Sequence, residues 1–216
     1  MNVQDIVQKR YSTKSFDASK KISAEDFAQI EAALRYSPSS VNIQPWHFVI
    51  TDNEAGKARV AKSAENFPYN LPKIINASHV IVFAARVHAD DDYLAGVLEQ
   101  EDKDGHFATA ENKQMGDNAR RTFLGIHRNQ MQDETQWLSR QVHINLGFTL
   151  FAAAALGVDA VPLEGVDMTV LDQEFGLAEK GYRAVAVVAL GYRAEDDFNA
   201  KLPKSRLENE VIFTKV

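Results

Sequence analysis

The sequence predicts an α+β or mixed α/β fold in which helices outnumber strands. Two apolar runs, at residues 80–85 and 184–190, have the composition of buried strands. Phe27, Ile30 and Leu34 recur at helical spacing. There is no Gly-x-Gly-x-x-Gly after a strand and no repeat of about 30 residues, which argues against a dinucleotide-binding fold and a solenoid. A chain of 216 residues is long enough for one well-packed domain.

The N-terminal part predicts three helices and two strands. Ser23, with Asp26 three positions later, is typical of a helix N-terminus. We expect helices at residues 3–9, 23–36 and 54–64, and strands at residues 46–51 and 80–85. The apolar residues of the 46–51 strand predict burial on both of its faces.

The remaining elements predict one domain, residues 1–216, with a helical excursion at about residues 90–131. We expect helices at 93–100, 111–130, 136–156 and 167–175, and strands at 158–162 and 184–190. Gly157 is placed to end the longest helix, whose second half is apolar all round and therefore predicts burial. Residues 211–216 alternate like an edge strand beyond the last turn. An orphan strand and a very apolar helix both predict a dimer that exchanges segments.

Composition excludes several functions. The net charge of −6 argues against nucleic acid and anionic membranes as main partners. Without cysteine the chain forms no disulfide and has no thiol chemistry. No signal peptide or membrane-spanning run is evident, so we expect a cytoplasmic protein. The six histidines lack ligand spacing, so we expect no metal; Glu101 and Asp102 lie in a charged run and predict a solvated face.

Two short basic clusters are the most informative features. One covers residues 10–14 and the other residues 204–206, and both combine cations with hydroxyl groups in loops. Either cluster alone is typical of a solvated surface. Together, if folding joins them, they offer arginine forks, lysine charges and serine hydroxyls, a set suited to phosphate. This interpretation favours a phosphorylated cofactor.

Three other segments could contact such a cofactor. Residues 38–46 carry short side chains and amides, although an ordinary helix-to-strand loop explains them equally well. Asn70 and Lys73 lie in an expected loop before a buried strand. Residues 160–165 end a strand with Pro162 and then Gly165, which is either a ligand-facing backbone or a plain turn.

These segments resemble the oxygen-insensitive nitroreductases of enteric bacteria, a family that includes flavin reductases and dihydropteridine reductases. The likeness rests on residues 10–16, 38–48, 162–165 and 202–207, and it spans nearly the whole chain in order. It implies a nitroreductase-like α+β fold with a central, mainly antiparallel sheet flanked by helices. It also implies a homodimer with exchanged C-terminal strands and one FMN in each of two interface sites.

The resemblance implies roles by position. The FMN phosphate is expected to contact Arg10, Ser12, Lys204 and Arg206, with Tyr11, Thr13 and Ser205 beside them. The ring is expected to contact Lys14, Asn70, Lys73, Pro162 and the backbone of Glu164 and Gly165, with Gln141 along the ribityl chain. Pro38, Ser39, Ser40 and Asn42 are expected from the other subunit. Val41, Phe67, Tyr69, His106 and Phe123, with Lys14, Asn70 and Lys73, are expected around NAD(P)H and acceptor.

The implied activity is reduction of nitroaromatics, quinones or flavins by NADH or NADPH, in ping-pong hydride transfer through N5 of FMN. No side chain is expected to act as a catalyst, because the cofactor carries the chemistry. Two alternatives remain open: a dihydropteridine reductase or NAD(P)H:flavin reductase on the same scaffold, and a non-catalytic flavin-binding dimer. Val41 and His106 stand where relatives often carry Thr and Arg, so the resemblance assigns neither nicotinamide preference nor acceptor range.

Overall fold

A computed structural model describes residues 2–216 of the chain. The elements in order are α1 (Val3–Lys9), α2 (Ala24–Arg35), the 3-10 turn η1 (Ser40–Asn42), β1 (Trp46–Thr51), α3 (Glu54–Ala61), η2 (Lys62–Ala64), α4 (Leu71–Asn76), β2 (His79–Arg86), α5 (Asp91–Lys103), α6 (Ala110–Gly125), the π-helical turn η3 (Ile126–Gln130), α7 (Glu134–Ala155), β3 (Asp159–Leu163), α8 (Met168–Phe175), η4 (Ala178–Lys180), β4 (Tyr182–Gly191), η5 (Phe198–Lys201) and α9 (Asn209–Ile212). None of the helices in this described part is long and apolar enough to cross a membrane.

The sheet has the order β1-β2-β4-β3, and every neighbouring pair is antiparallel. This confirms the expected α+β architecture. The central strands β2 and β4 are buried along most of their length, as their apolar sequences predict. The prediction that β1 is buried on both faces is wrong: Ile50 is 37% exposed. β1 is an edge strand that packs on β2, whereas α7 crosses β2, β4 and β3.

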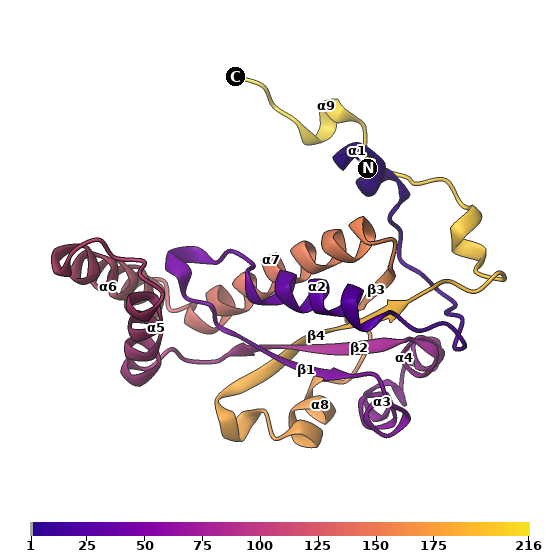
Figure 1. Ribbon diagram of the computed structural model, residues 1–216, viewed down its shortest axis with the longest axis horizontal. Coiled ribbons are helices and arrows are strands. Elements are labelled where there is room, and N and C mark those ends of the chain that lie inside the picture. The colour runs from indigo at the N-terminus through magenta and orange to yellow at the C-terminus, as the bar shows by residue number, and fades with distance from the viewer. Residues whose placement is uncertain (1) are drawn as a thin grey trace.

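Alternation along β2 divides the core into two layers. Val80, Val82 and Ala84 face α3, α4 and α8, where Val60, Ile74 and Leu171 complete the first layer. Ile81, Phe83 and Ala85 face α2 and α7, where Ile30, Leu34 and Val142 complete the second. Successive side chains of a strand point to opposite faces, so a single strand supports both layers. Figure 1 shows α2 and α7 on one side of the sheet and α3 and α8 on the other.

Helix boundaries follow local chemistry at several ends. The Ser23 hydroxyl accepts a hydrogen bond from Asp26 N at 3.0 Å, and Asp167 caps α8 by accepting from the N–H groups of residues 169 and 170. Gly157 follows α7 with φ at +76°, a conformation that favours glycine. These caps confirm the predicted ends.

Two predicted local structures are wrong. Asn70 is the N-cap residue of α4 and Lys73 lies within that helix rather than in a loop. A six-residue helix with proline in its first turn is too short to show periodicity. Residues 211–216 do not form a strand within the described chain: α9 is a single helical turn and the residues after it are exposed. A strand needs a neighbour for its backbone groups, and this segment extends away from the body (Figure 1).

The apolar half of α7 is only partly covered. Ala153 is buried, but Phe148 is 43% exposed, and Ile144 in the preceding turn is 48% exposed. The sequence predicts burial all round for the second half of this helix, and the single chain leaves one apolar face open. Exposed apolar surface on a central helix is typical of an interaction face.

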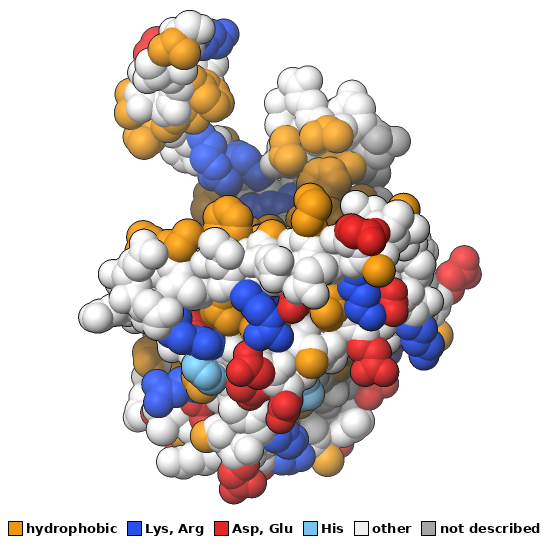
Figure 2. Space-filling view, turned by 90° about the vertical axis from the view of Figure 1, so that its left-hand side faces the viewer, with side chains coloured by type: hydrophobic (Ala, Val, Ile, Leu, Met, Phe, Trp, Pro, Cys, Tyr) orange, Lys and Arg blue, Asp and Glu red, His pale blue; other side chains and the backbone are white. Residues whose placement is uncertain are grey.

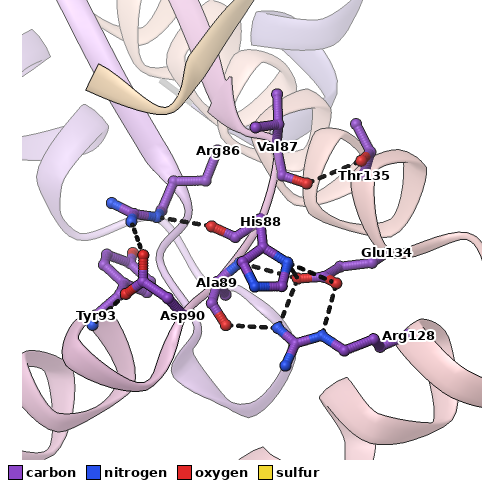
Figure 3. A network of polar contacts seen from close by, with 9 residues as sticks. All are labelled: Arg86, Val87, His88, Ala89, Asp90, Tyr93, Arg128, Glu134 and Thr135. Atoms are coloured by element: carbon purple, nitrogen blue, oxygen red, sulfur yellow. Dashed lines mark hydrogen bonds and ion pairs between the residues drawn. The ribbon is translucent and has the colours of Figure 1, made fainter. Parts of the chain in front are cut away.

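Helices α5 and α6 project from the end of the sheet (Figure 1). A polar network at the end of β2 fixes their base, as Figure 3 shows. The Glu134 carboxylate accepts hydrogen bonds from Ala89 N at 2.9 Å and from both Nε and Nη2 of Arg128. The Arg86 guanidinium pairs with Asp90 and lies 4.0 Å from the centroid of the Tyr93 ring. The projecting helices are therefore anchored to the start of α7 by several charged contacts.

Candidate functional site

The two basic clusters meet in the folded chain. They line a cavity of about 450 Å³ between the end of α1 and the segment that follows η5. The lining residues are Gln8, Lys9, Arg10, Tyr11, Ser12, Asn199, Ala200, Leu202, Pro203, Lys204, Ser205 and Arg206. Figure 2 shows Lys and Arg side chains gathered in a hollow near the top of the molecule, below the projecting C-terminal segment. The sequence interpretation that folding joins the clusters is confirmed.

Backbone pairing holds the first cluster in place. Ser12 forms a parallel bridge to Ala160 of β3, and Phe16 forms an antiparallel bridge to Arg193 after β4. Residues 10–17 therefore run between β3 and the chain that leaves β4. The Lys204 ammonium group donates hydrogen bonds to the carbonyl oxygens of Val7, at 2.7 Å, and Arg10. This contact joins the C-terminal cluster to the N-terminal one.

The cations of the cavity repel one another. Burial and the nearby Arg206 guanidinium lower the pKa of Arg10. Burial, followed by Arg10 and Arg206, lowers the pKa of Lys204. A bound anion reverses this repulsion, and arginine forks with an adjacent hydroxyl, here that of Ser12, are the donors that bind phosphate most specifically. The donor set therefore fits a phosphate group.

A buried carboxylate organises the cluster, and the sequence analysis missed it. Asp197 is 1% exposed. Its Oδ2 accepts hydrogen bonds from the Tyr11 hydroxyl at 2.9 Å and from Lys14 N at 3.2 Å, while Oδ1 accepts from Asn199 N at 3.0 Å. Asn199 in turn donates to the carbonyl oxygen of Ser12. Asp197 follows two other acidic residues, so its sequence context resembles a solvated charged run.

We expect Asp197→Asn to lower the free energy of unfolding by about 1–3 kcal/mol, because an amide cannot accept from Tyr11, Lys14 and Asn199 at once. Urea unfolding of the purified variant measures this loss. Asp196→Asn is the matched control, since Asp196 is exposed and carries the same charge. Equal stability of the two variants would show that Asp197 does not organise the cluster.

A second group of polar residues lies at the far end of β3. The Asn70 side chain donates to the carbonyl oxygen of Gly165 at 2.8 Å and accepts from the Lys73 ammonium group at 2.7 Å. Burial and the charge of Lys14 lower the pKa of Lys73. An added Cβ at position 165 would lie 2.8 Å from Asn70 Nδ2 and 3.2 Å from the Tyr69 hydroxyl, so a larger residue would displace the ends of these two side chains.

These contacts extend the site along β3 from the phosphate cluster towards Lys73. Phe67 and the exposed Tyr69 pack edge to face beside Gly165, with ring centroids 6.4 Å apart. Pro162 is half-buried at the end of β3 and Glu164 is exposed after it. Thr13 is fully buried, and its hydroxyl has no hydrogen-bond partner among residues 2–216. The structure thus brings together the expected residues of one subunit.

The other expected residues lie elsewhere. The loop formed by residues 38–44, which we call the 38–44 loop, contacts the first half of α7, where Gln141 Oε1 accepts from Ser40 N at 2.9 Å. Arg10 lies near the other end of α7, since it lines a second, smaller cavity together with Ala154. Thirteen residues of helix separate these positions, or about 20 Å at 1.5 Å per residue. Gln141 therefore lies with the 38–44 loop and not beside the phosphate cluster of its own chain.

Phe123 and His106 belong to the projecting helices. Phe123 is on α6 and 48% exposed, and His106 is exposed between α5 and α6 with its ring edge against Phe107. The prediction that Glu101 is solvated is wrong: it is 6% exposed because it pairs with Arg120. No sequence pattern separates this glutamate from its charged neighbours.

The antiparallel sheet has a cationic cavity at one edge and the polar group of Asn70, Lys73 and Gly165 beyond it, an arrangement that fits an elongated phosphorylated ligand. A family model described as the nitroreductase family matches residues 7–192. The chain belongs to the nitroreductase family.

Individual members of the family match this chain over nearly its full length. The chain is 51% identical to an oxygen-insensitive NAD(P)H nitroreductase of Salmonella typhimurium, with 100% of each covered. It is 36% identical to the major NAD(P)H-flavin oxidoreductase of Aliivibrio fischeri, covering 96% of this chain and 95% of the relative. The crystal structure of a nitroreductase-type protein from Exiguobacterium sibiricum in complex with FMN superposes with a TM-score of 0.82 at 25% identity, covering 100% and 98%.

Proposed function

We propose that this chain is an FMN-dependent oxidoreductase that uses NADH or NADPH to reduce nitroaromatics, quinones or flavins. The observation that carries the proposal is the meeting of Arg10, Lys204 and Arg206 at one cavity in a chain whose net charge is −6. The nitroreductase name of the Salmonella relative supports the activity, and the FMN complex of the Exiguobacterium protein supports the cofactor. We also propose that the protein acts in the cytoplasm and that residues 1–216 form a single domain.

The chain's own residues would bind and orient the cofactor. Arg10, Ser12, Lys204 and Arg206 would hold the phosphate, and Lys14, Asn70, Lys73 and Gly165 would contact the ring. FMN supplies two-electron exchange when bound, so the protein needs no nucleophile of its own. Phe67 and Tyr69 would exclude water from one side of the pocket and leave room for a planar donor or acceptor.

We propose a homodimer as the working form. About 20 Å of α7 separates the end near Arg10 from the 38–44 loop of the same chain, which favours a second subunit as the source of the loop at each FMN site. A second subunit packed on the open face of α7, at Ile144 and Phe148, could supply its 38–44 loop instead. The sheet has two outer edges, on β3 and on β1. Within residues 2–216, Ser12 pairs with the edge of β3, whereas no segment pairs with the edge of β1. The β1 edge is therefore the place where an exchanged C-terminal strand would add to the sheet.

An anaerobic absorbance spectrum of the purified protein, before and after addition of NADH or NADPH, tests the function. Flavin bands that bleach with nucleotide and return with a nitroaromatic or quinone would support it. Flavin that stays oxidised with either nucleotide would favour a non-catalytic flavin-binding dimer, and no flavin after addition of FMN would contradict the cofactor.

A flavin reductase on the same scaffold is the second candidate, favoured by the Aliivibrio relative. A dihydropteridine reductase remains the other alternative. The ratio of kcat/KM values for free FMN, a pteridine and a nitroaromatic acceptor, each measured with the same nucleotide, separates the three activities.

We expect the affinity for FMN relative to riboflavin to fall as the pH rises towards the ordinary lysine pKa. Burial and neighbouring cations lower the pKa of Lys204 in the free protein, so its charge is lost before that of an exposed lysine. Phosphate binding favours the protonated form, and only FMN carries phosphate. In Lys204→Arg the ratio should stay flat, because arginine keeps its charge throughout this range. Fluorescence titrations across the alkaline range measure both ligands. A ratio that is constant in the wild type would contradict the role of Lys204.

We expect Phe123→Ala to change acceptor preference by about tenfold while FMN affinity stays the same. A half-exposed aromatic ring stacks on planar acceptors, and its loss removes roughly 0.5–1.5 kcal/mol of ring–ring contact in addition to buried area. The measurement compares kcat/KM for a nitroaromatic and for a small quinone. Met115→Ala on the same helix is the control, since Met115 is exposed and apolar but lies two turns away. Unchanged selectivity in Phe123→Ala would remove Phe123 from the pocket.

A further inference from the structure

The 38–44 loop has an unusual backbone. Val41, Asn42 and Gln44 have φ values of +46°, +50° and +47°, all in the left-handed region. Non-glycine residues rarely adopt this region, and a β-branched residue such as Val41 is an outlier there. Three such residues within four positions persist only where the surrounding structure holds them.

Side chains from two helices and from the loop itself hold the loop at its two ends. The Tyr93 hydroxyl of α5 lies 2.9 Å from the carbonyl oxygen of Ile43 and 2.6 Å from that of Gln44. Gln141 of α7 accepts from Ser40 N, and the Ser39 hydroxyl accepts from Gln44 N at 3.0 Å. These contacts hold the two ends of the 38–44 loop. They do not reach its strained centre, Val41 and Asn42.

A buried ion pair between the projecting helices holds that centre. Arg120 Nε donates to the carbonyl oxygen of Val41 at 3.0 Å, and Arg120 Nη2 lies 2.6 Å from both carboxylate oxygens of Glu101. Glu101 Oε1 also accepts from the Asn42 side-chain amide at 2.7 Å. The side chains are 3% and 7% exposed. A buried pair recovers little net stability after desolvation, so its position against a strained loop points to a positioning role.

We propose that Glu101 and Arg120 are positioning residues that hold Val41 and Asn42 in the conformation required by the FMN site of the second subunit. The inference rests on the proposed function, since it takes FMN as the ligand and the 38–44 loop as a contribution from the neighbouring chain. Helices α5 and α6 then act as the scaffold that presents one subunit's loop to the other subunit's cofactor.

Substitutions of Glu101 or Arg120 should weaken FMN binding by more than their effect on protein stability explains. Arg120→Met is expected to raise the dissociation constant of FMN by about 10- to 100-fold, the range for a lost hydrogen bond to a charged group. Arg120→Lys should recover part of the affinity, because lysine can reach one of the two acceptors but not both. If Arg120→Met does not fold, Glu101→Gln replaces it in the same measurement, because glutamine keeps the shape of the glutamate side chain.

Leu171→Ala is the control for stability. Leu171 is fully buried in α8 on the opposite side of the sheet, so its truncation lowers the melting temperature without touching the 38–44 loop. When the two variants have lost melting temperature to the same extent, FMN affinity should be unchanged in Leu171→Ala and reduced in Arg120→Met. Equal affinities in the two variants would overturn the positioning role.

A mixed dimer tests whether the pair acts across the interface. One subunit carries Arg206→Ala, the other carries Arg120→Met, and two affinity tags isolate the heterodimer. Action on the second subunit leaves one site intact and one doubly damaged, so FMN titration should show one wild-type site per dimer. Two weakened sites and no wild-type site would overturn the inference. Failure of the wild-type dimer to bind FMN would instead contradict the proposed function, and the two failures are thus distinct.

Discussion

Arg206→Ala is expected to weaken FMN binding by about 10- to 100-fold, because a hydrogen bond to a charged group contributes roughly 1.5–3 kcal/mol. The same substitution should leave the free energy of unfolding of the apoprotein unchanged or slightly higher. Arg206 lowers the pKa values of Arg10 and Lys204, so its removal relieves repulsion among the cations. FMN fluorescence titration and urea unfolding of the apoprotein measure the two quantities.

Lys201→Ala is the matched control. Lys201 is an exposed cation five residues earlier, outside the lining of the cavity. It should bind FMN like the wild type. If Arg206→Ala binds FMN with wild-type affinity, or if both variants lose affinity equally, the phosphate role of Arg206 is wrong and only a general charge effect remains.

Ending the chain after Glu208 is expected to convert the proposed dimer to monomers at micromolar concentration and to abolish tight FMN binding. The removed segment exposes Val211, Ile212 and Phe213 in the single chain, at 69%, 52% and 60%. Burial of each would contribute about 1.5–3 kcal/mol, and a twofold dimer counts each contact twice. The phosphate cluster is retained, so lost FMN would report the missing second subunit. Sedimentation velocity measures the mass.

A charge-only variant of the same segment, Glu210→Gln with Lys215→Gln, is the control. It keeps the apolar side chains and should remain dimeric with FMN bound. A truncated protein that stays dimeric would show that residues 209–216 contribute little to the interface. A truncated monomer with wild-type FMN affinity would show that each site belongs to one chain.

The core of the fold could be predicted from the sequence because its signals are local. The apolar runs of β2 and β4, the Ser23 cap and Gly157 each act over a few residues. The burial of β1 could not be predicted, since the order β1-β2-β4-β3 is a property of the whole sheet. The C-terminal segment is similar: alternating residues predict a strand, but a strand also needs a sheet edge beside it, and within one chain this segment extends away from the sheet.

The candidate site could be predicted where residue type alone indicates the chemistry. Cations with hydroxyls suggest phosphate wherever they lie, and the fold joined the clusters at residues 10–14 and 204–206. Asp197 and Glu101 could not be predicted, because an acidic residue in a charged run has the same sequence pattern whether it is buried or solvated. Their burial depends on Tyr11 and Arg120, contacts that only the fold creates.

The contact between Lys204 and Arg10 joins residues 194 positions apart. During translation a ribosome adds residues 10–14 long before residues 204–206. A nascent chain that already holds the four strands of the sheet therefore has only the first of the two basic clusters. Tight binding of a phosphorylated cofactor is expected to await the synthesis of residues 204–206, so chains terminated before them should not retain flavin.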